Sequence, residues 1–310
     1  MHSRRQLLQG TLAALALAVS GRARAAQGRS NFHAIYDNPE LREAFFPFLV
    51  HVFHLMPEDA FHELIARSVE AHDDDESIYR AIAAGLDDIT PFHATLTYAI
   101  PALRTQKEVL GSQTAALLDG VGPIDGYVEI GTNGSYIEPV RDRVELTGPV
   151  VLLTDKPQTF SPSEMIQRGS LRRNATFVPM GDYDPVAREA LPDAAVDLVS
   201  SYIGFHHAPL ERLDPFVESL HRILRPGGRL VLREHDVDTD TQDELVALAH
   251  DVFNVGTHLS WETNADQLRH FRSVDRWTTL LEGHGFRREE GRALQEGDPT
   301  DNALLVFARA

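Results

Sequence analysis

The sequence predicts an α/β protein in which a doubly wound sheet follows an N-terminal helical region. From about residue 124, short apolar runs alternate with helical stretches, which is typical of parallel strands joined by helices. Before that point, apolar residues recur at helical spacing and no strand alternation is evident. The chain has 310 residues, 43% hydrophobic and 24% charged, which suits one large globular domain with a cap.

Composition narrows the classes of partner. The net charge is -17, which argues against nucleic acid because binding phosphates requires clustered cations. The chain contains no cysteine, which excludes disulfides, thiolate metal sites and cysteine nucleophiles. Outside the N-terminal segment no apolar run is long enough to span a bilayer, so we expect no stable membrane insertion of the mature chain. A small-molecule substrate is the partner that remains.

The first 25 residues have the three parts of an export signal. Arg4 and Arg5 precede the apolar run "TLAALALAVSG", and a small-x-small cleavage motif ends at Ala25. The paired arginines followed by two leucines resemble a twin-arginine signal, so the export machinery is an expected partner and the location is periplasmic or secreted. The alternative is a basic terminus with a chance apolar stretch on a cytoplasmic protein. Cleavage would leave 25 basic and 46 acidic residues.

Residues 26–120 form the predicted helical cap. Asn38 followed by Pro39 suits a helix cap with proline in the first turn. Aromatic and aliphatic residues then recur at helical spacing in "NPELREAFFPFLVHVFHLM", and three further stretches repeat the pattern. We interpret the aromatic stripe as core, because such a stripe is more often core than a ligand box.

Residues 121–310 form the predicted sheet domain. The strands are expected in the runs "GYVEI", "VVLLT", "ATFVPM", "VDLVSSYI", "GGRLVLREH" and "ALLVFARA". A helix that ends in "LRPGG" precedes the fifth of these runs. The last run follows a turn signal and is expected to pair antiparallel with the segment before it.

The run "EIGTNGSY" follows the first predicted strand and is the candidate ligand loop. Such a loop lies at the carboxyl edge of the sheet, where doubly wound folds bind ligands. Gly131 and Gly134 permit a sharp turn and close backbone approach. The loop has two glycines where cofactor loops usually carry three, and it is neither a dinucleotide fingerprint nor a phosphate loop.

Two acids strengthen this interpretation. Asp155 ends the second predicted strand, 21 residues after Gly134, where an acid binds the hydroxyls of a ribose. Asp182 follows the third predicted strand, where its side chain would face an adenine edge.

At this point the sequence resembles the class I S-adenosylmethionine-dependent methyltransferases of the small-molecule type. "YVEIGTNGSY" is similar to the first motif of that family, and "LHRILRPGGRLVL" is similar to its run before the fifth strand. The resemblance implies a seven-stranded Rossmann-like sheet with the last strand antiparallel and S-adenosyl-L-methionine as cofactor. It implies that Glu129 and Gly131 hold the methionine end, Asp155 the ribose and Asp182 the adenine.

The loop departs from the family pattern at two positions. Asn133 stands at the second glycine position and Ser135 at the third. Asparagine tolerates left-handed backbone better than most residues, so we expect the turn to survive. We therefore include Asn133 and Gly134 among the cofactor-binding residues of an altered pocket.

Histidines gather after the fourth and fifth predicted strands. His206 and His207 lie in "GFHHAP", and His235 precedes Asp236 at the end of the next strand. A histidine here could take a proton from an acceptor hydroxyl, and we predict catalytic roles for His206, His207 and His235. A metal site that also uses Asp236 and His250 is a second interpretation, and ordinary polar loop residues are a third. No HxH or HExxH spacing supports the metal, and none is predicted.

The predicted function is methyl transfer to a small molecule. Oxygen is the preferred acceptor atom, because Ser200 to Ile203 lack the Asn/Asp-Pro-Pro-aromatic form of amino-group methylation. S-adenosylmethionine is made in the cytoplasm, so export would separate the enzyme from its cofactor supply. An exported binding protein that does not methylate, or a His/Asp metal-dependent enzyme on the same scaffold, therefore remain as alternatives.

Overall fold

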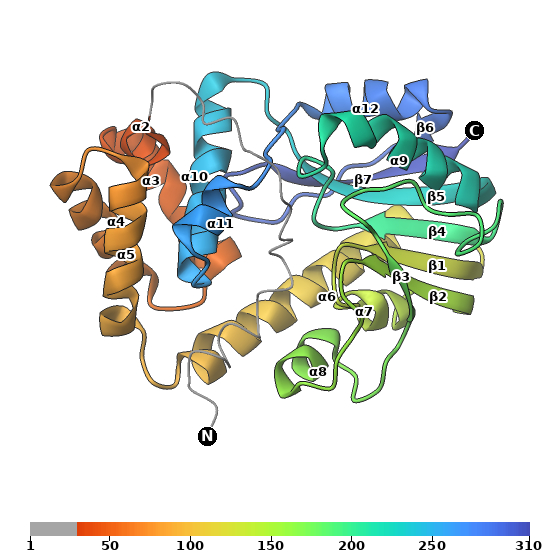
Figure 1. The fold of residues 1–310 in the computed structure, drawn as a ribbon, viewed down its shortest axis with the longest axis horizontal. Helices are drawn as coiled ribbons and strands as arrows, with labels where there is room; N and C mark the ends of the chain where they lie inside the picture. The colour runs from red at the N-terminus through yellow and green to blue at the C-terminus, as the bar shows by residue number, and fades with distance from the viewer. Residues whose placement is uncertain (1–29) are drawn as a thin grey trace.

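The computed structural model describes residues 30–310, and Figure 1 shows their arrangement. The predicted export signal at residues 1–25 lies outside these described residues. A sheet flanked by helices forms one part of the molecule, and a group of helices packs beside it (Figure 1). Within the described residues, no helix has the length and apolar character needed to cross a membrane.

The segment before the sheet is helical, as predicted. Asn38 caps the second helix by accepting hydrogen bonds from the backbone N–H groups of Glu40 and Leu41, and Pro39 occupies its first turn. The elements are α2 (Asn31–Tyr36), α3 (Pro39–Phe48), η2 (Leu49–Phe53), α4 (Glu58–Ala71), α5 (Asp75–Ile89), η3 (Thr95–Ala99) and α6 (Ile100–Leu117).

The predicted seven-stranded sheet is confirmed. Its strands are β1 (Ile124–Ile130), β2 (Leu146–Thr154), β3 (Thr176–Pro179), β4 (Val196–Ser201), β5 (Leu224–His235), β6 (Phe286–Arg288) and β7 (Asn302–Arg309). Their spatial order is β3-β2-β1-β4-β5-β7-β6, and β7 pairs antiparallel with both β5 and β6. The order reverses between β1 and β4, which is the place where folds of this kind bind ligands.

The remaining helices are α7 (Ile137–Arg141), α8 (Pro162–Arg168), α9 (Leu210–Ile223), α10 (Asp240–Gly256), α11 (Trp261–Ala265) and α12 (Val274–Gly283). Helices α9 and α12 pack with the strands in one core cluster, and α6 and α7 pack in a second (Figure 1). Buried apolar side chains therefore cover both faces of the sheet, which explains why most residues of β4 and of the second half of β5 are buried.

The cap is built from two separate parts of the chain. Helix α10 contributes Leu245, Leu248 and Val252 to the same buried cluster as α2 to α5. Contact between the two parts is close, because a Cβ added at Gly256 would lie 2.2 Å from the Phe53 ring. Helix α6, by contrast, packs on the sheet side through Leu110.

Strand register places the carboxyl ends of four strands side by side. Ile130 of β1 pairs with Leu153 of β2 and with Ser201 of β4, and Leu153 pairs in turn with Val178 of β3. The segments that follow these residues all begin at one edge of the sheet. This edge carries the glycine loop, the two predicted acids and the first histidine pair.

Candidate functional site

Glu129 anchors the glycine loop from below. Its side chain is fully buried, and its carboxylate accepts hydrogen bonds from the hydroxyls of Thr132 and Tyr127 and from the backbone N–H of Tyr136 at 3.3 Å. Burial raises the pKa of Glu129 to about 7. One carboxylate oxygen thus holds the turn in place and the other is bound by Tyr127 of β1, and direct contact with a cofactor stays a prediction for this residue.

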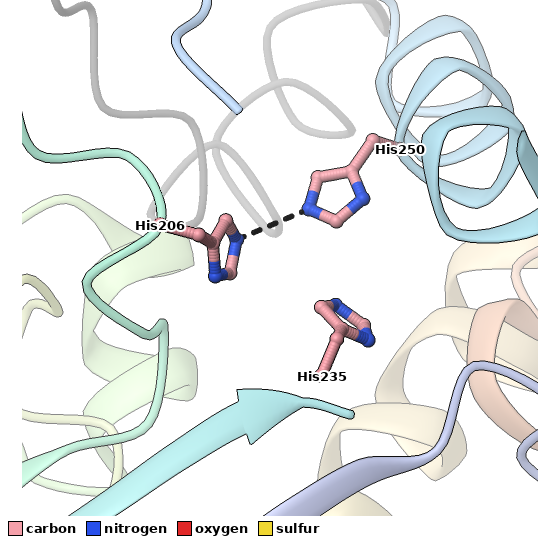
Figure 2. A group of neighbouring side chains, drawn as sticks. All are labelled: His206, His235 and His250. Carbon is pink, nitrogen blue, oxygen red and sulfur yellow. Dashed lines mark hydrogen bonds between the residues drawn. The ribbon is translucent and has the colours of Figure 1, made fainter. Parts of the chain in front are cut away.

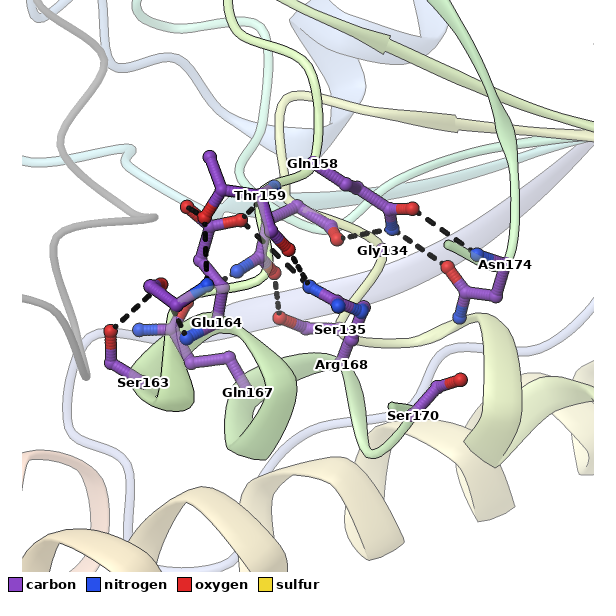
Figure 3. A network of polar contacts seen from close by, with 12 residues as sticks. Gly134, Ser135, Gln158, Thr159, Ser163, Glu164, Gln167, Arg168, Ser170 and Asn174 are labelled. Atoms are coloured by element: carbon purple, nitrogen blue, oxygen red, sulfur yellow. Dashed lines mark hydrogen bonds and ion pairs between the residues drawn. The ribbon is translucent and has the colours of Figure 1, made fainter. Parts of the chain in front are cut away.

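The loop itself is held by side chains from the neighbouring segment. Asn133 donates from its amide to Gln167 and accepts from the Ser135 hydroxyl at 2.7 Å. Gln158 donates to the Asn133 carbonyl and to the Asn174 amide oxygen, both at 2.7 Å, and Figure 3 shows the contact between Gln158 and Asn174. Gly134 has φ +87°, and a Cβ there would lie 2.6 Å from Gln158 Nε2. Gly134 is therefore needed for packing within the protein. Asn133, which stands at the second glycine position of the family motif, holds the loop through its side-chain hydrogen bonds.

The two predicted acids lie at the same edge as the loop. Asp155 is exposed and follows β2 directly. Asp182 follows β3 with φ +57°, and one of its oxygens lies 3.6 Å from the Arg212 guanidinium. The other oxygen is buried and has no hydrogen-bond partner among the described residues. An acceptor left free at this point fits a ligand that brings an N–H donor, such as the adenine amino group of S-adenosylmethionine.

The histidines line a cavity of about 100 Å³. Its walls come from the sheet edge, from the cap and from α10. They comprise Phe48, Val52, Gln106, Tyr202, Ile203, His206, His207, Arg233, His235, Ala249, His250, Phe253, Asn254, Gln267, Thr300 and Asn302. All three predicted catalytic histidines therefore meet at one place, although their catalytic roles stay a prediction.

His206 is tied to a buried acid of the neighbouring strand. Its Nδ1 lies 2.7 Å from Oε2 of Glu234, whose other oxygen accepts the backbone N–H of Phe205. The close approach requires Gly204, because a Cβ there would lie 2.5 Å from the His206 ring. Burial raises the pKa of Glu234 to about 8 and lowers that of His206 to about 3.

Backbone carbonyls fix the tautomers of three other histidines. Nδ1 of His207 lies 2.8 Å from the Leu268 oxygen, Nδ1 of His235 lies 2.9 Å from that of Thr300, and Nδ1 of His250 lies 2.9 Å from that of Val246. A carbonyl only accepts, so in each ring Nδ1 carries the proton and Nε2 presents a lone pair. Burial lowers the pKa of all three imidazoles, so they are neutral at pH 7.

Of the residues in the metal site that the sequence suggested, Asp236 is the one that does not join the histidines of the cavity. Asp236 faces away, because its oxygens accept from the Val274 backbone N–H at 2.8 Å and from Arg292 at 2.7 Å. Sequence reasoning also missed Glu234. The signal for it was an acidic residue directly before His235 at the carboxyl end of the strand.

Two tyrosines whose rings are in tilted contact connect the glycine loop to the histidine cavity. Tyr202 lines the cavity, and its ring centroid lies 4.5 Å from that of Tyr136. Tyr136 is the last residue of the loop and donates its backbone N–H to Glu129. The predicted cofactor edge and the cavity are thus joined by direct contact at the point where the strand order reverses.

Comparison with known proteins agrees with this architecture. The sequence model of the family described as "Methyltransferase domain" matches residues 164–232, from α8 into β5. The match includes the "LRPGG" run and does not reach the glycine loop. No curated protein sequence matched the chain.

Many solved structures share the fold. The pyocyanin biosynthetic protein PhzM has a TM-score of 0.52 at 14% identity, over 90% of this chain and 76% of that chain. A Burkholderia thailandensis 1,6-didemethyltoxoflavin-N1-methyltransferase, solved with S-adenosylhomocysteine, has a TM-score of 0.44 at 13% identity, over 74% of this chain and 89% of that chain. At such identities the likeness to PhzM shows the fold alone. The chain therefore has the fold of PhzM, and its residues 164–232 are similar to the methyltransferase family.

Proposed function

We propose that the chain transfers a methyl group from S-adenosylmethionine to an oxygen atom of a small, largely apolar acceptor held in the histidine cavity. The observation that carries this proposal is the contact between Tyr136 and Tyr202, which joins the cofactor edge to the cavity. A methyl donor on one side and an acceptor on the other would meet at this contact. The free oxygen of Asp182 supports the adenine end of the same arrangement.

The residues would divide the work between binding and chemistry. When bound, the cofactor supplies an electrophilic methyl group on a sulfonium, so the protein needs chiefly to align the acceptor and exclude water. Phe48, Val52 and Phe253 give the cavity apolar walls that suit an aromatic or aliphatic acceptor. His206 is occupied by Glu234, and His207 is therefore the better candidate for the general base.

Calorimetry with S-adenosylhomocysteine and a panel of phenols tests the proposal. We expect binding of the cofactor product and methylation of phenols, with matched anilines as the control for nitrogen. His207→Ala should lower turnover by about 10²- to 10⁴-fold and leave cofactor affinity within a few-fold. Failure of the wild-type protein to bind adenosylmethionine or adenosylhomocysteine would remove the proposal.

We also propose export by the twin-arginine route, which rests on the sequence of residues 1–25 alone. Because this route moves folded proteins, a bound cofactor could travel with the chain. Replacing Arg4 and Arg5 by lysine should retain the uncleaved chain in the cytoplasm, as cell fractionation would measure. Finding the wild-type chain uncleaved in the cytoplasm would show that the export proposal is wrong.

A further inference from the structure

Three histidines of the cavity converge on one point. His206 follows β4, His235 ends β5, and His250 comes from α10 (Figure 2). One ring nitrogen of each lies within 4.8 Å of the other two. Their ring centroids form a nearly equilateral triangle, with sides of 5.3 to 5.5 Å. The Phe271 ring packs against all three and adds an apolar wall.

The outer nitrogen of each ring is anchored in the way that metal-binding histidines are anchored. Nδ1 of His206 faces the Glu234 carboxyl group, and Nδ1 of His235 and of His250 each face a backbone carbonyl. Histidines that bind metals usually donate their second N–H to a carboxylate or a carbonyl, which fixes the ring orientation. All three rings of the cluster have such a partner.

One pair of inner nitrogens has the spacing of two ligands on one ion, and the His235 nitrogen lies within 4.8 Å of both. Nε2 of His206 and Nε2 of His250 are 3.3 Å apart. With zinc–nitrogen bonds of about 2.0–2.1 Å, two ligands of a tetrahedral ion are separated by about 3.3–3.4 Å. A hydrogen bond between the two rings would explain this pair alone. It would not involve His235, whose Nδ1 is anchored by the Thr300 carbonyl and whose Nε2 has a long contact of 3.4 Å with the Asn302 amide nitrogen, which a metal ion would replace.

We propose that His206, His235 and His250 bind one divalent metal ion of the zinc class. Three neutral imidazoles and no protein carboxylate form a ligand set that suits zinc and similar transition metals. The fourth position would be open toward the cavity and would take an oxygen ligand. The site itself does not depend on the proposed methyl transfer. The assignment of its open position to the acceptor oxygen rests on that function.

Cobalt substitution provides the direct test on the full chain, prepared without a histidine tag. After treatment with a chelator, Co²⁺ should bind in one equivalent and give the visible absorption of a tetrahedral ion. His235→Ala and His250→Ala should each weaken metal binding by at least about 100-fold, whereas His207→Ala is the matched control. His207 lies in the same cavity, but it is outside the trio and should keep the metal affinity within a few-fold.

Glu234→Gln tests the anchoring of His206 while preserving side-chain shape. It should lower metal affinity by about 10- to 100-fold, because it alters the partner that orients the ligand. The cobalt spectrum of the wild type needs no variant, so misfolding of a mutant cannot hide the result. The proposal is overturned if the wild type binds no more Co²⁺ than a variant with His206, His235 and His250 all replaced by alanine. It is also overturned if His207→Ala loses as much metal affinity as His235→Ala or His250→Ala.

Adenosylhomocysteine calorimetry on the metal-free wild type separates the two proposals. Cofactor binding without Co²⁺ binding would reject the metal site and leave the proposed methyl transfer intact. The opposite result would support the metal site and reject the methyl transfer.

Discussion

Gly134→Ala is the sharpest test of how the glycine loop is held. The new Cβ would lie 2.6 Å from Gln158 Nε2, and 3.0 Å from both Asn174 Oδ1 and the Ile137 side chain. Gln158 would have to move, and it would lose its hydrogen bonds to the Asn133 carbonyl and the Asn174 amide oxygen, each 2.7 Å long. Gln158 is only 3% exposed, so its amide would be left without water to replace these partners.

The expected loss of stability has two components. Alanine in left-handed backbone costs about 1–2 kcal/mol, and the displaced buried amide adds about 2–3 kcal/mol. Gly120→Ala is the matched control, because Gly120 has φ +77° and no atom within 4 Å of its added Cβ. It should show the backbone component alone.

Urea unfolding measures both variants. Gly134→Ala should lose about 2–3 kcal/mol more free energy of unfolding than Gly120→Ala, which is about 30- to 150-fold in the equilibrium constant. Adenosylhomocysteine affinity should fall for Gly134→Ala and stay unchanged for Gly120→Ala. Equal losses of stability would refute the reasoning, because the collision with Gln158 would then have no energetic consequence.

Three further predictions address the cofactor edge and the cap. Asp155→Ala should weaken adenosylmethionine binding by about 30- to over 100-fold in calorimetry, whereas Asp119→Ala should not. Glu129, which faces the Tyr127 hydroxyl and Lys107, has a folded pKa of about 7 against an ordinary 4.5. The folded state therefore keeps the Glu129 carboxyl group protonated to a higher pH than the unfolded state does. The contribution of this group to the free energy of unfolding, up to about 3 kcal/mol, is lost as the pH rises from about 4.5 to 7. Glu129→Gln should flatten that part of the curve of stability against pH. Asp251→Ala should lower the free energy of unfolding by about 3–5 kcal/mol, because it leaves the partly buried Arg269 guanidinium without its carboxylate at 2.7 Å. Asp266 is an exposed acid nearby, and Asp266→Ala should change the free energy of unfolding little.

The positions of most strands and the antiparallel last strand were the parts of the fold that the sequence could predict. Apolar runs such as "VVLLT" mark strands buried on both faces, and the turn signal before residue 302 marks the antiparallel return. The carboxyl ends of parallel strands meet at one edge, so Gly131, Asp155 and Asp182 could be expected to lie side by side.

The contacts within the site could not be read from the pattern. Gln158 and Gln167 bind the loop from a segment more than twenty residues away, and nothing in their local sequence signals this. Asp236 looked equivalent to His235 by position, but neighbouring strand residues point to opposite faces, so only one of the two faces the cavity. Such choices depend on side-chain direction and on long-range packing.

Helix α10 connects the cap to the chemistry of the edge. One side of the helix packs in the cap cluster through Leu248 and Val252, while His250 reaches Nε2 of His206 at the sheet edge. Asp251, the next residue, accepts hydrogen bonds from Asn31 of α2 and Asn264 of α11. Consecutive residues of α10 therefore hold the cap together and complete the histidine cluster. The position of His250 relative to His206, and with it the geometry of the cavity, therefore depends on how α10 packs in the cap.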